Sequence, residues 1–150
     1  MIDNTLDNHN GKHILAEFWH CQCETELLCR AQPLQTRLCQ AVKSVGLTLV
    51  GQTAHEFHPV KQPGKHLKPV GVTIALLLAE SHLCLHSWGE FKAVTLDIYV
   101  CNFQSDNSEK AEKLFQICRE ILQPDRYNMD VVGRSHCPAG ALSECDKNIS

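Results

Sequence analysis

The chain has 150 residues, enough for one domain with a substantial hydrophobic core and too few for two. Hydrophobic residues make up 43% and charged residues 21%, a globular composition that argues against a disordered chain. The net charge of -3 gives no electrostatic reason to expect a nucleic acid or an anionic membrane as partner. No apolar run approaches the roughly 20 residues of a membrane-spanning helix, and the polar N-terminus has no signal-peptide core. We therefore expect a single cytoplasmic domain over residues 1–150.

The first half of the chain contains apolar runs that are typical of strands. These predicted strands are Ile14–Trp19, Leu47–Val50 and Val70–Ala79. Between the first two, apolar residues at helical spacing follow Pro33, and Gly46 supplies a stop for this helix. Residues 51–68 contain two prolines, two glycines and three histidines, which predicts a loop.

The second half begins with a strand that follows Glu80-Ser81, and Val94–Cys101 then alternates with period two. A helix with an apolar face follows, and Pro124 ends it. Tyr127–Val132 is a last short strand, and residues 135–150 form a polar tail. The order β-α-β-β-β-β-α-β predicts an α+β two-layer sandwich, mainly an antiparallel sheet with helices on one face. The other face of such a sheet often lies at an interface.

Nine cysteines are present, an odd count without the spacing of a disulfide framework. In a chain with no export signal, this pattern indicates reduced thiols.

The segment from Gly71 to Cys101 carries a distinctive constellation. It contains ESH, then His86-Ser87-Trp88-Gly89-Glu90, then a strand that ends in Cys101. This resembles the bacterial and archaeal S-adenosylmethionine decarboxylase family, whose hallmark is ESH and HTWPE followed by a strand that ends in cysteine. GKHILAEFW resembles the opening strand of the same family, and the likeness extends to Gly133.

The resemblance implies a self-cleaving enzyme. The Ser81 hydroxyl would attack the carbonyl of Glu80, with His86 as the base for the elimination that follows and Thr73 where the family usually has an assisting serine. Cleavage would produce chains 1–80 and 81–150, the second beginning with a covalent pyruvoyl group derived from Ser81. This ketone would condense with a substrate amine and draw electrons from the breaking bond to the carboxylate, and Cys101 matches the family's proton donor. The implied activity is decarboxylation of S-adenosylmethionine in polyamine and spermidine biosynthesis.

Strand periodicity adds an observation about Ser81 and His86. They are five positions apart, so an undistorted strand sends them to opposite faces. Either a bulge redirects one of them, or His86 serves the Ser81 of a second subunit. The resemblance implies the second alternative, a homodimer with shared active sites that forms a larger sandwich.

The substrate pocket departs from the family pattern. Glu90, Trp88 and Phe57 remain as candidate substrate-binding residues, but Gly89 replaces the family's proline, which loosens the turn that positions Glu90. An insertion of about ten residues splits the family pattern before Thr73, and counting back from Thr73 without the insertion puts Leu67 where the family has its adenine-stacking phenylalanine. Ornithine or arginine is therefore an alternative substrate.

Two other classes compete with this enzyme. His82-x-Cys84-x-His86 puts three potential ligands on one strand face, as a metal site could, but the usual CxxC spacing is absent and we assign no metal ligands. The chain could also be a non-catalytic paralogue that regulates a true decarboxylase. The presence of Ser81, His86 and Cys101 together favours the enzyme.

Overall fold

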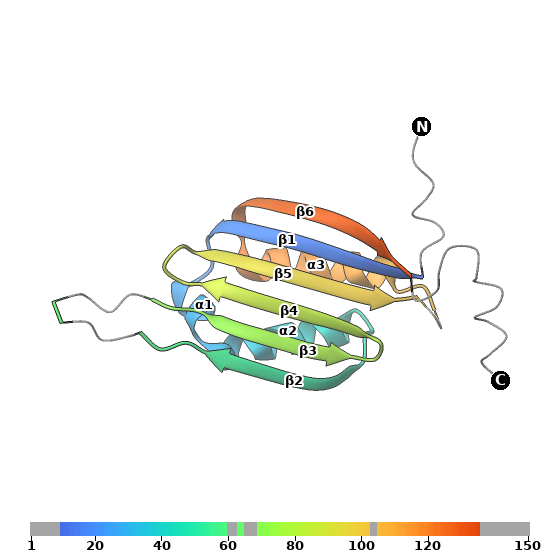
Figure 1. The fold of residues 1–150 in the computed structure, drawn as a ribbon, viewed down its shortest axis with the longest axis horizontal. Helices are drawn as coiled ribbons and strands as arrows, with labels where there is room; N and C mark the ends of the chain where they lie inside the picture. The colour runs from blue at the N-terminus through green and yellow to red at the C-terminus, as the bar shows by residue number, and fades with distance from the viewer. Residues whose placement is uncertain (1–9, 60–62, 65–68, 103–104, 136–150) are drawn as a thin grey trace.

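The computed structural model describes residues 10–59, 63–64, 69–102 and 105–135, and Figure 1 shows the fold. The elements in chain order are β1 (Gly11–Cys21), α1 (Thr25–Cys29), α2 (Ala31–Ser44), β2 (Leu49–Glu56), β3 (Val72–Leu78), β4 (Ser81–Trp88), β5 (Ala93–Cys101), α3 (Ser108–Leu122) and β6 (Pro124–Arg134). The predicted tail from 136 onward and Leu67 lie outside the described residues.

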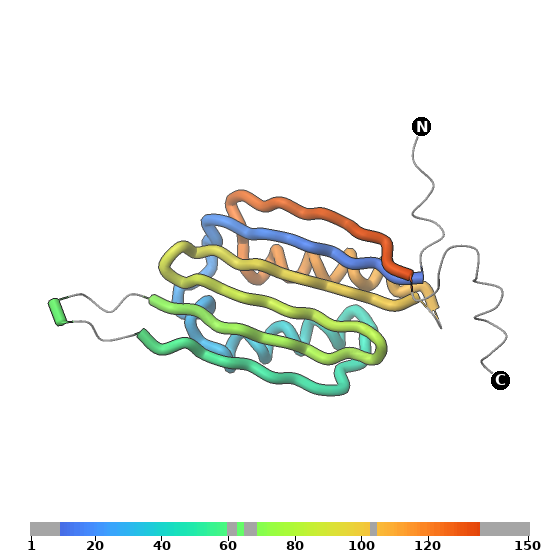
Figure 2. The backbone as a smooth tube through the Cα atoms, in the orientation of Figure 1, coloured from blue at the N-terminus to red at the C-terminus, as the bar shows by residue number. Residues whose placement is uncertain are grey.

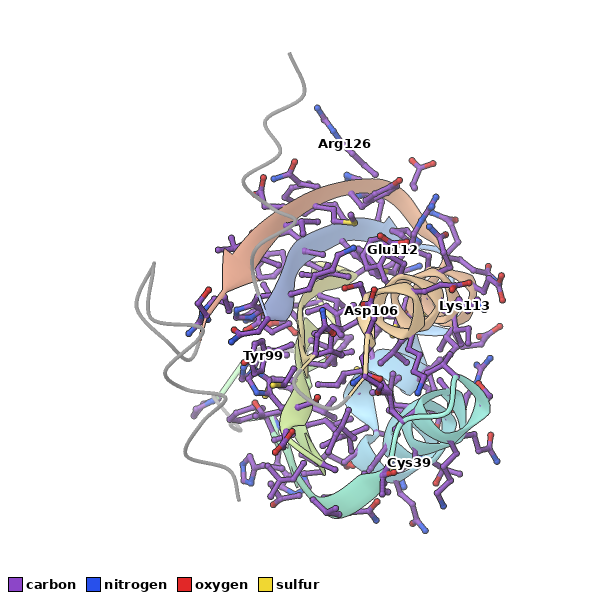
Figure 3. The ribbon with its side chains drawn as sticks, turned by 90° about the vertical axis from the view of Figure 1, so that its right-hand side faces the viewer. Cys39, Tyr99, Asp106, Glu112, Lys113 and Arg126 are labelled. Carbon is purple, nitrogen blue, oxygen red and sulfur yellow. The ribbon has the colours of Figure 1, made fainter. Side chains whose placement is uncertain are left out.

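One sheet contains all six of these strands, in the order β2-β3-β4-β5-β1-β6, and every neighbouring pair is antiparallel. The helices cover one face of the sheet (Figure 1), and the view turned by 90° shows the other face without a covering element among the described residues (Figure 3). The prediction of an α+β two-layer sandwich is confirmed. We call the uncovered side the open face.

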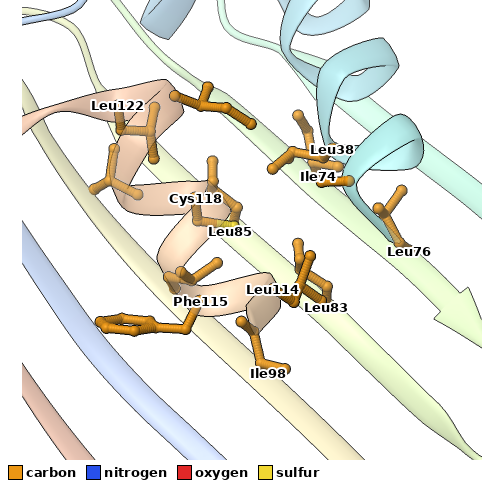
Figure 4. Close-up of a cluster of buried hydrophobic side chains, with 14 of the residues drawn as sticks. Leu38, Ile74, Leu76, Leu83, Leu85, Ile98, Leu114, Phe115, Cys118 and Leu122 are labelled. Atoms are coloured by element: carbon orange, nitrogen blue, oxygen red, sulfur yellow. The ribbon is translucent and has the colours of Figure 1, made fainter. Parts of the chain in front are cut away.

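The alternation predicted for the central strands produces the core. On β5, Val94, Leu96, Ile98 and Val100 are at most 1% exposed. They pack against the apolar side of α3, which contributes Leu114, Phe115 and Cys118 (Figure 4). Because strand side chains alternate between faces, the residues of β5 that lie between these buried ones point to the open face.

The predicted loop over residues 51–68 is wrong at its beginning, because β2 continues to Glu56 and pairs with β3. This strand has the polar sequence GQTAHE, and most of its residues are exposed because it is an edge strand. Without a buried face, it lacks the apolar alternation by which strands are recognised. The short helix α1 was also not predicted.

The helix ends follow the local rules that the sequence indicates. The Ser108 backbone N–H donates to Asp106 Oδ1 at 2.9 Å, which satisfies a free donor in the first turn of α3 and lowers the pKa of Asp106. After α2, Gly46 adopts a φ of 87°, which is accessible to glycine without strain. No helix in the described part of the chain is long and apolar enough to span a membrane.

Candidate active site

The expected cleavage site lies at the tight turn between β3 and β4. Leu78 and Ser81 are the last paired residues, so Ala79 and Glu80 alone make the turn. Glu80 has a φ of 58°, a left-handed conformation that costs a residue with a side chain about 1 to 2 kcal/mol. The bond between Glu80 and Ser81 therefore follows a strained residue on an exposed turn.

Ser81 lies beside the end of β5. Its Oγ accepts a hydrogen bond from the backbone N–H of Cys101 at 3.3 Å. Both Ser81 and Cys101 are partly buried. The structure thus brings together the residues expected to supply the pyruvoyl precursor and the proton donor, although they are 20 positions apart. We call Glu80, Ser81 and Cys101 the cleavage end of the sheet.

His86 and Thr73 meet elsewhere, on neighbouring strands of the open face. Thr73 Oγ1 lies 3.0 Å from His86 Nδ1, and the two residues are directly paired across β3 and β4. The registers of β4 with β3 and with β5 are continuous over this stretch, so no bulge redirects either Ser81 or His86. The bulge alternative is thereby excluded.

The two groups are too far apart to act together within one chain. His86 follows Ser81 by five positions on a regular strand, which spans about 17 Å, and Trp88 lies about 23 Å from Ser81. Figure 2 shows the β3–β4 turn and the β4–β5 turn at opposite ends of the sheet. We call Thr73, His86 and the residues of the β4–β5 turn the histidine end.

The β4–β5 turn is tightly held despite the glycine at its start. The Gly89 N–H donates to the Val70 carbonyl at 2.9 Å, and an added Cβ would lie 2.4 Å from both Cys29 Sγ and that carbonyl. A proline would lose this hydrogen bond and occupy that space. The expectation of a looser turn is therefore wrong, because α1 and the Val70 backbone compensate.

The buried side chain of Ser87 also holds the segment before the β4–β5 turn in place. It is 5% exposed, its Oγ donates to the Leu28 carbonyl at 2.6 Å, and it accepts from the Val72 N–H at 3.0 Å. These bonds tie β4 to α1 and β3 immediately before the candidate substrate-binding residues. Serine thus has a structural role in the HSWGE motif.

The candidate substrate-binding residues are available to solvent. Glu90 is exposed, and Trp88 and Phe57 are 41% and 48% exposed. Phe57 packs edge-on against His55 with 4.7 Å between ring centroids, and its N–H donates to the Gly71 carbonyl at 2.9 Å. An exposed aromatic ring and a free carboxylate at one end of the sheet can accept a ligand with a flat ring and hydroxyl groups.

A cluster on the open face near the cleavage end was not predicted from the sequence. His13, His82 and Tyr99, from three adjacent strands, have ring centroids 5.5 to 5.9 Å apart. Figure 3 shows Tyr99 on the side of the sheet away from the helices. Arg134 Nη1 lies 3.0 Å from His13 Nδ1. Burial lowers the pKa of His13, although Asp97 opposes this effect, and raises the pKa of Tyr99. These residues are brought together only by the register of β1, β4 and β5. The sequence does not specify that register between strands so far apart in the chain, so the cluster could not be predicted.

The metal hypothesis finds no support in this geometry. Among the described residues, no group of three or more histidine, cysteine, aspartate or glutamate side chains is arranged to hold a metal ion. His82 packs against Tyr99 and His86 contacts Thr73, so these histidines have other partners. Burial and the adjacent Asp97 raise the pKa of Cys84, which disfavours the thiolate that a metal requires.

Comparisons with known proteins agree with the motif. The family model described as S-adenosylmethionine decarboxylase matches residues 12–135. An S-adenosylmethionine decarboxylase proenzyme of Archaeoglobus fulgidus is 32% identical over 124 residues, which cover 83% of this chain and 96% of that protein. One from Methanococcus vannielii is 31% identical and covers 79% of this chain and 84% of its own length. The crystal structure of the adenosylmethionine decarboxylase from Aquifex aeolicus superposes with a TM-score of 0.69 at 28% identity, covering 87% of this chain and 95% of that one. The chain belongs to the S-adenosylmethionine decarboxylase family.

Proposed function

We propose that this protein is a proenzyme that cleaves itself between Glu80 and Ser81 and then decarboxylates S-adenosylmethionine, using a pyruvoyl group derived from Ser81. The observation that carries the proposal is the position of Ser81, directly after a strained residue and hydrogen-bonded to the backbone of Cys101. Relatives that align along most of the chain are named S-adenosylmethionine decarboxylase proenzymes.

The cleavage end can promote the first step by its geometry. The left-handed Glu80 holds the scissile bond at the point where a two-residue turn joins β4, where the backbone has little freedom to relax. Breaking the bond releases the strain, so the turn contributes its 1 to 2 kcal/mol, by an order-of-magnitude estimate, toward cleavage. The new chain would start at the first residue of β4, beside Cys101.

The residues at this end also suit a pyruvoyl group. Once formed, such a group supplies an electrophilic carbonyl that binds a substrate amine and accepts electrons as the carboxylate leaves. Cys101 is partly buried at the adjacent strand end, and its backbone N–H is hydrogen-bonded to Ser81 Oγ, so its thiol can return a proton from close range. This role rests on its proximity to Ser81.

The histidine end would complete the site of a second copy. Within one chain, Thr73 and His86 lie about 17 Å from Ser81, beyond the reach of a proton transfer. Two sheets packed through their open faces, with their strands reversed, would place the histidine end of one copy over the cleavage end of the other. Two buried atoms on the open face, His13 Nε2 and Glu17 Oε2, have no hydrogen-bond partner within the described chain. Buried polar atoms usually have hydrogen-bond partners, so the lack of a partner for these two atoms within one chain supports a homodimer with shared active sites.

The substrate is proposed from the residues of the histidine end. Trp88 and Phe57 present aromatic surface and Glu90 presents a carboxylate, a combination that suits an adenine ring and ribose hydroxyls. A plain amino acid such as ornithine or arginine would use little of this aromatic surface. We therefore place S-adenosylmethionine first, with decarboxylation for polyamine synthesis as the biological role.

The decisive experiment is an intact mass of the purified protein under denaturing conditions, with Ser81→Ala as control. Two fragments meeting at Glu80 and Ser81, the second blocked by a pyruvoyl group, are expected from the wild type alone. Release of carbon dioxide from S-adenosylmethionine, ornithine and arginine is then compared directly. A single uncut wild-type chain would overturn the proposal and favour a non-catalytic paralogue. Cleavage with turnover of ornithine or arginine only would retain the enzyme class and overturn the substrate.

A further inference from the structure

The short segment 28–31, where α1 ends and α2 begins, contacts both parts of the chain that carry the candidate substrate-binding residues. On one side it is bonded to the backbone that holds the β4–β5 turn, which follows Trp88 and carries Glu90. On the other side it is bonded to the end of β2, which leads directly into Phe57. We call residues 28–31 the helix junction.

Cys29 holds the β4–β5 turn through a shared carbonyl. Its Sγ donates to the Val70 carbonyl at 3.0 Å, and the Gly89 N–H donates to the same oxygen at 2.9 Å. Burial raises the pKa of the Cys29 thiol, and the nearby Glu90 carboxylate adds to this effect. The thiol therefore stays protonated and keeps the hydrogen that it donates.

Glu56 holds the end of β2 to the same junction. Its Oε2 accepts from the Ala31 backbone N–H at 2.8 Å, and its Oε1 lies 3.6 Å from Arg30 Nε. The Ala31 N–H belongs to the first turn of α2, so the carboxylate also meets the positive end of the helix dipole. Phe57 follows Glu56 directly, and its own N–H donates to the Gly71 carbonyl. One junction thus holds both halves of the candidate substrate pocket.

The spacing between these halves matters because Phe57 and Trp88 lie on the same face of the sheet. Each is two residues beyond a residue paired with Thr73, His55 on β2 and His86 on β4. Since β3 runs between them, their backbones are about 10 Å apart. A flat ring can contact both aromatic side chains only over a narrow range of such spacings.

We propose that the helix junction is a positioning element for substrate binding, in which Cys29 and Glu56 fix the spacing between the β4–β5 turn and Phe57. This inference rests on the proposed function, whose substrate these residues would bind. The cleavage end lies at the opposite end of the sheet (Figure 2). The two residues therefore act on substrate affinity, and self-cleavage and the chemical step do not depend on them.

The first test is the steady-state kinetics of the full chain with S-adenosylmethionine. Cys29→Ala and Glu56→Ala should each raise KM about three- to tenfold at an unchanged kcat, the effect of losing one hydrogen bond. Cys29→Ser keeps a donor and Glu56→Gln keeps an acceptor, so each should stay within about twofold of the wild-type KM. Cys39→Ala is the matched control, because this thiol of α2 donates to Gln52 Oε1 at 3.0 Å in the middle of β2, and it should leave KM unchanged.

The double variant, Cys29→Ala with Glu56→Ala, distinguishes one junction from two separate contacts. Loss of either contact already leaves the spacing unfixed, so the KM of the double variant should exceed the larger single effect by no more than about twofold. A KM near the product of the two single effects would overturn the proposal. So would unchanged KM values in both single variants, or a loss in kcat in place of the rise in KM.

Amide hydrogen exchange separates this inference from the proposed function. Cys29→Ala should speed exchange at the Gly89 N–H, and Glu56→Ala should speed exchange at the Phe57 N–H, while self-cleavage stays complete. Unchanged exchange at both amides overturns the positioning role even if S-adenosylmethionine is the substrate. Faster exchange in a protein that does not decarboxylate S-adenosylmethionine leaves the junction standing and overturns the proposed substrate.

Discussion

Coexpression of two damaged chains tests whether the active site is shared. One chain carries Ser81→Ala and the other His86→Ala, so that each lacks one of the two ends of the site. Because His86 lies about 17 Å from Ser81 along a regular strand, neither chain can assemble a complete site alone. In a mixed dimer, the Ser81 of one chain meets the His86 of the other.

The expected yield follows from random assortment. About half of the dimers are mixed, and each of them holds one complete site and one site that lacks both groups. Cleavage and decarboxylation should therefore reach about one quarter of the wild-type value per chain. All of the cut material should be the His86→Ala chain, because only it retains Ser81.

Intact mass measures this result directly, since the two substitutions label the fragments. As a control, wild type is coexpressed with a chain that carries both substitutions. Mixed dimers then have no complete site, so about half of the wild-type chains should stay uncut. Absence of cut His86→Ala chains, or full cleavage of the wild type in the control, would refute the shared site and require His86 to act within its own chain.

Three further predictions concern stability. Ser87→Ala should lower the free energy of unfolding by about 1 to 3 kcal/mol in urea titrations, because it leaves the buried Val72 N–H without its acceptor; an unchanged midpoint would contradict this role. Gly89→Ala should cost about 1 to 3 kcal/mol, since the added Cβ would lie 2.4 Å from Cys29 Sγ and the Val70 carbonyl, and a wild-type melting temperature would refute the clash. Burial lowers the pKa of His13 below 6.5, so the unfolded chain binds the proton more readily and stability should fall as the pH decreases through about 6.5. His13→Asn should flatten this dependence, and an identical slope would show that His13 is not its source.

The central strands could be predicted from the sequence because their cause is local. β3 and β5 carry apolar residues at the period of a buried strand, and each is flanked by turn residues. The α3 helix could be predicted equally well, since its apolar residues recur at helical spacing and Pro124 follows its end. Only the beginning of β2 was predicted, within Leu47–Val50, because the exposed remainder of this edge strand is held by backbone hydrogen bonds that any polar sequence can make.

The candidate site also has features that could be predicted from the sequence and features that could not. Residue types and spacing identify Ser81, His86 and Cys101, and the period of two along a strand puts Ser81 and His86 on opposite faces. The role of Gly89 was misjudged, because the partner that fills the space beside it, Cys29, belongs to a short helix about 60 positions earlier.

The amino-acid sequence by itself determined the family motif, the alternation of the central strands and the odd difference in position, five, between Ser81 and His86. These properties depend on neighbours along the chain, and short-range geometry translates them directly into faces and periods. Only the tertiary structure decided that Cys101 lies against Ser81, that Thr73 contacts His86, and that His13, His82 and Tyr99 cluster on the open face. Each of these contacts depends on the order and register of the strands, which are set by how the whole sheet buries one face against the helices.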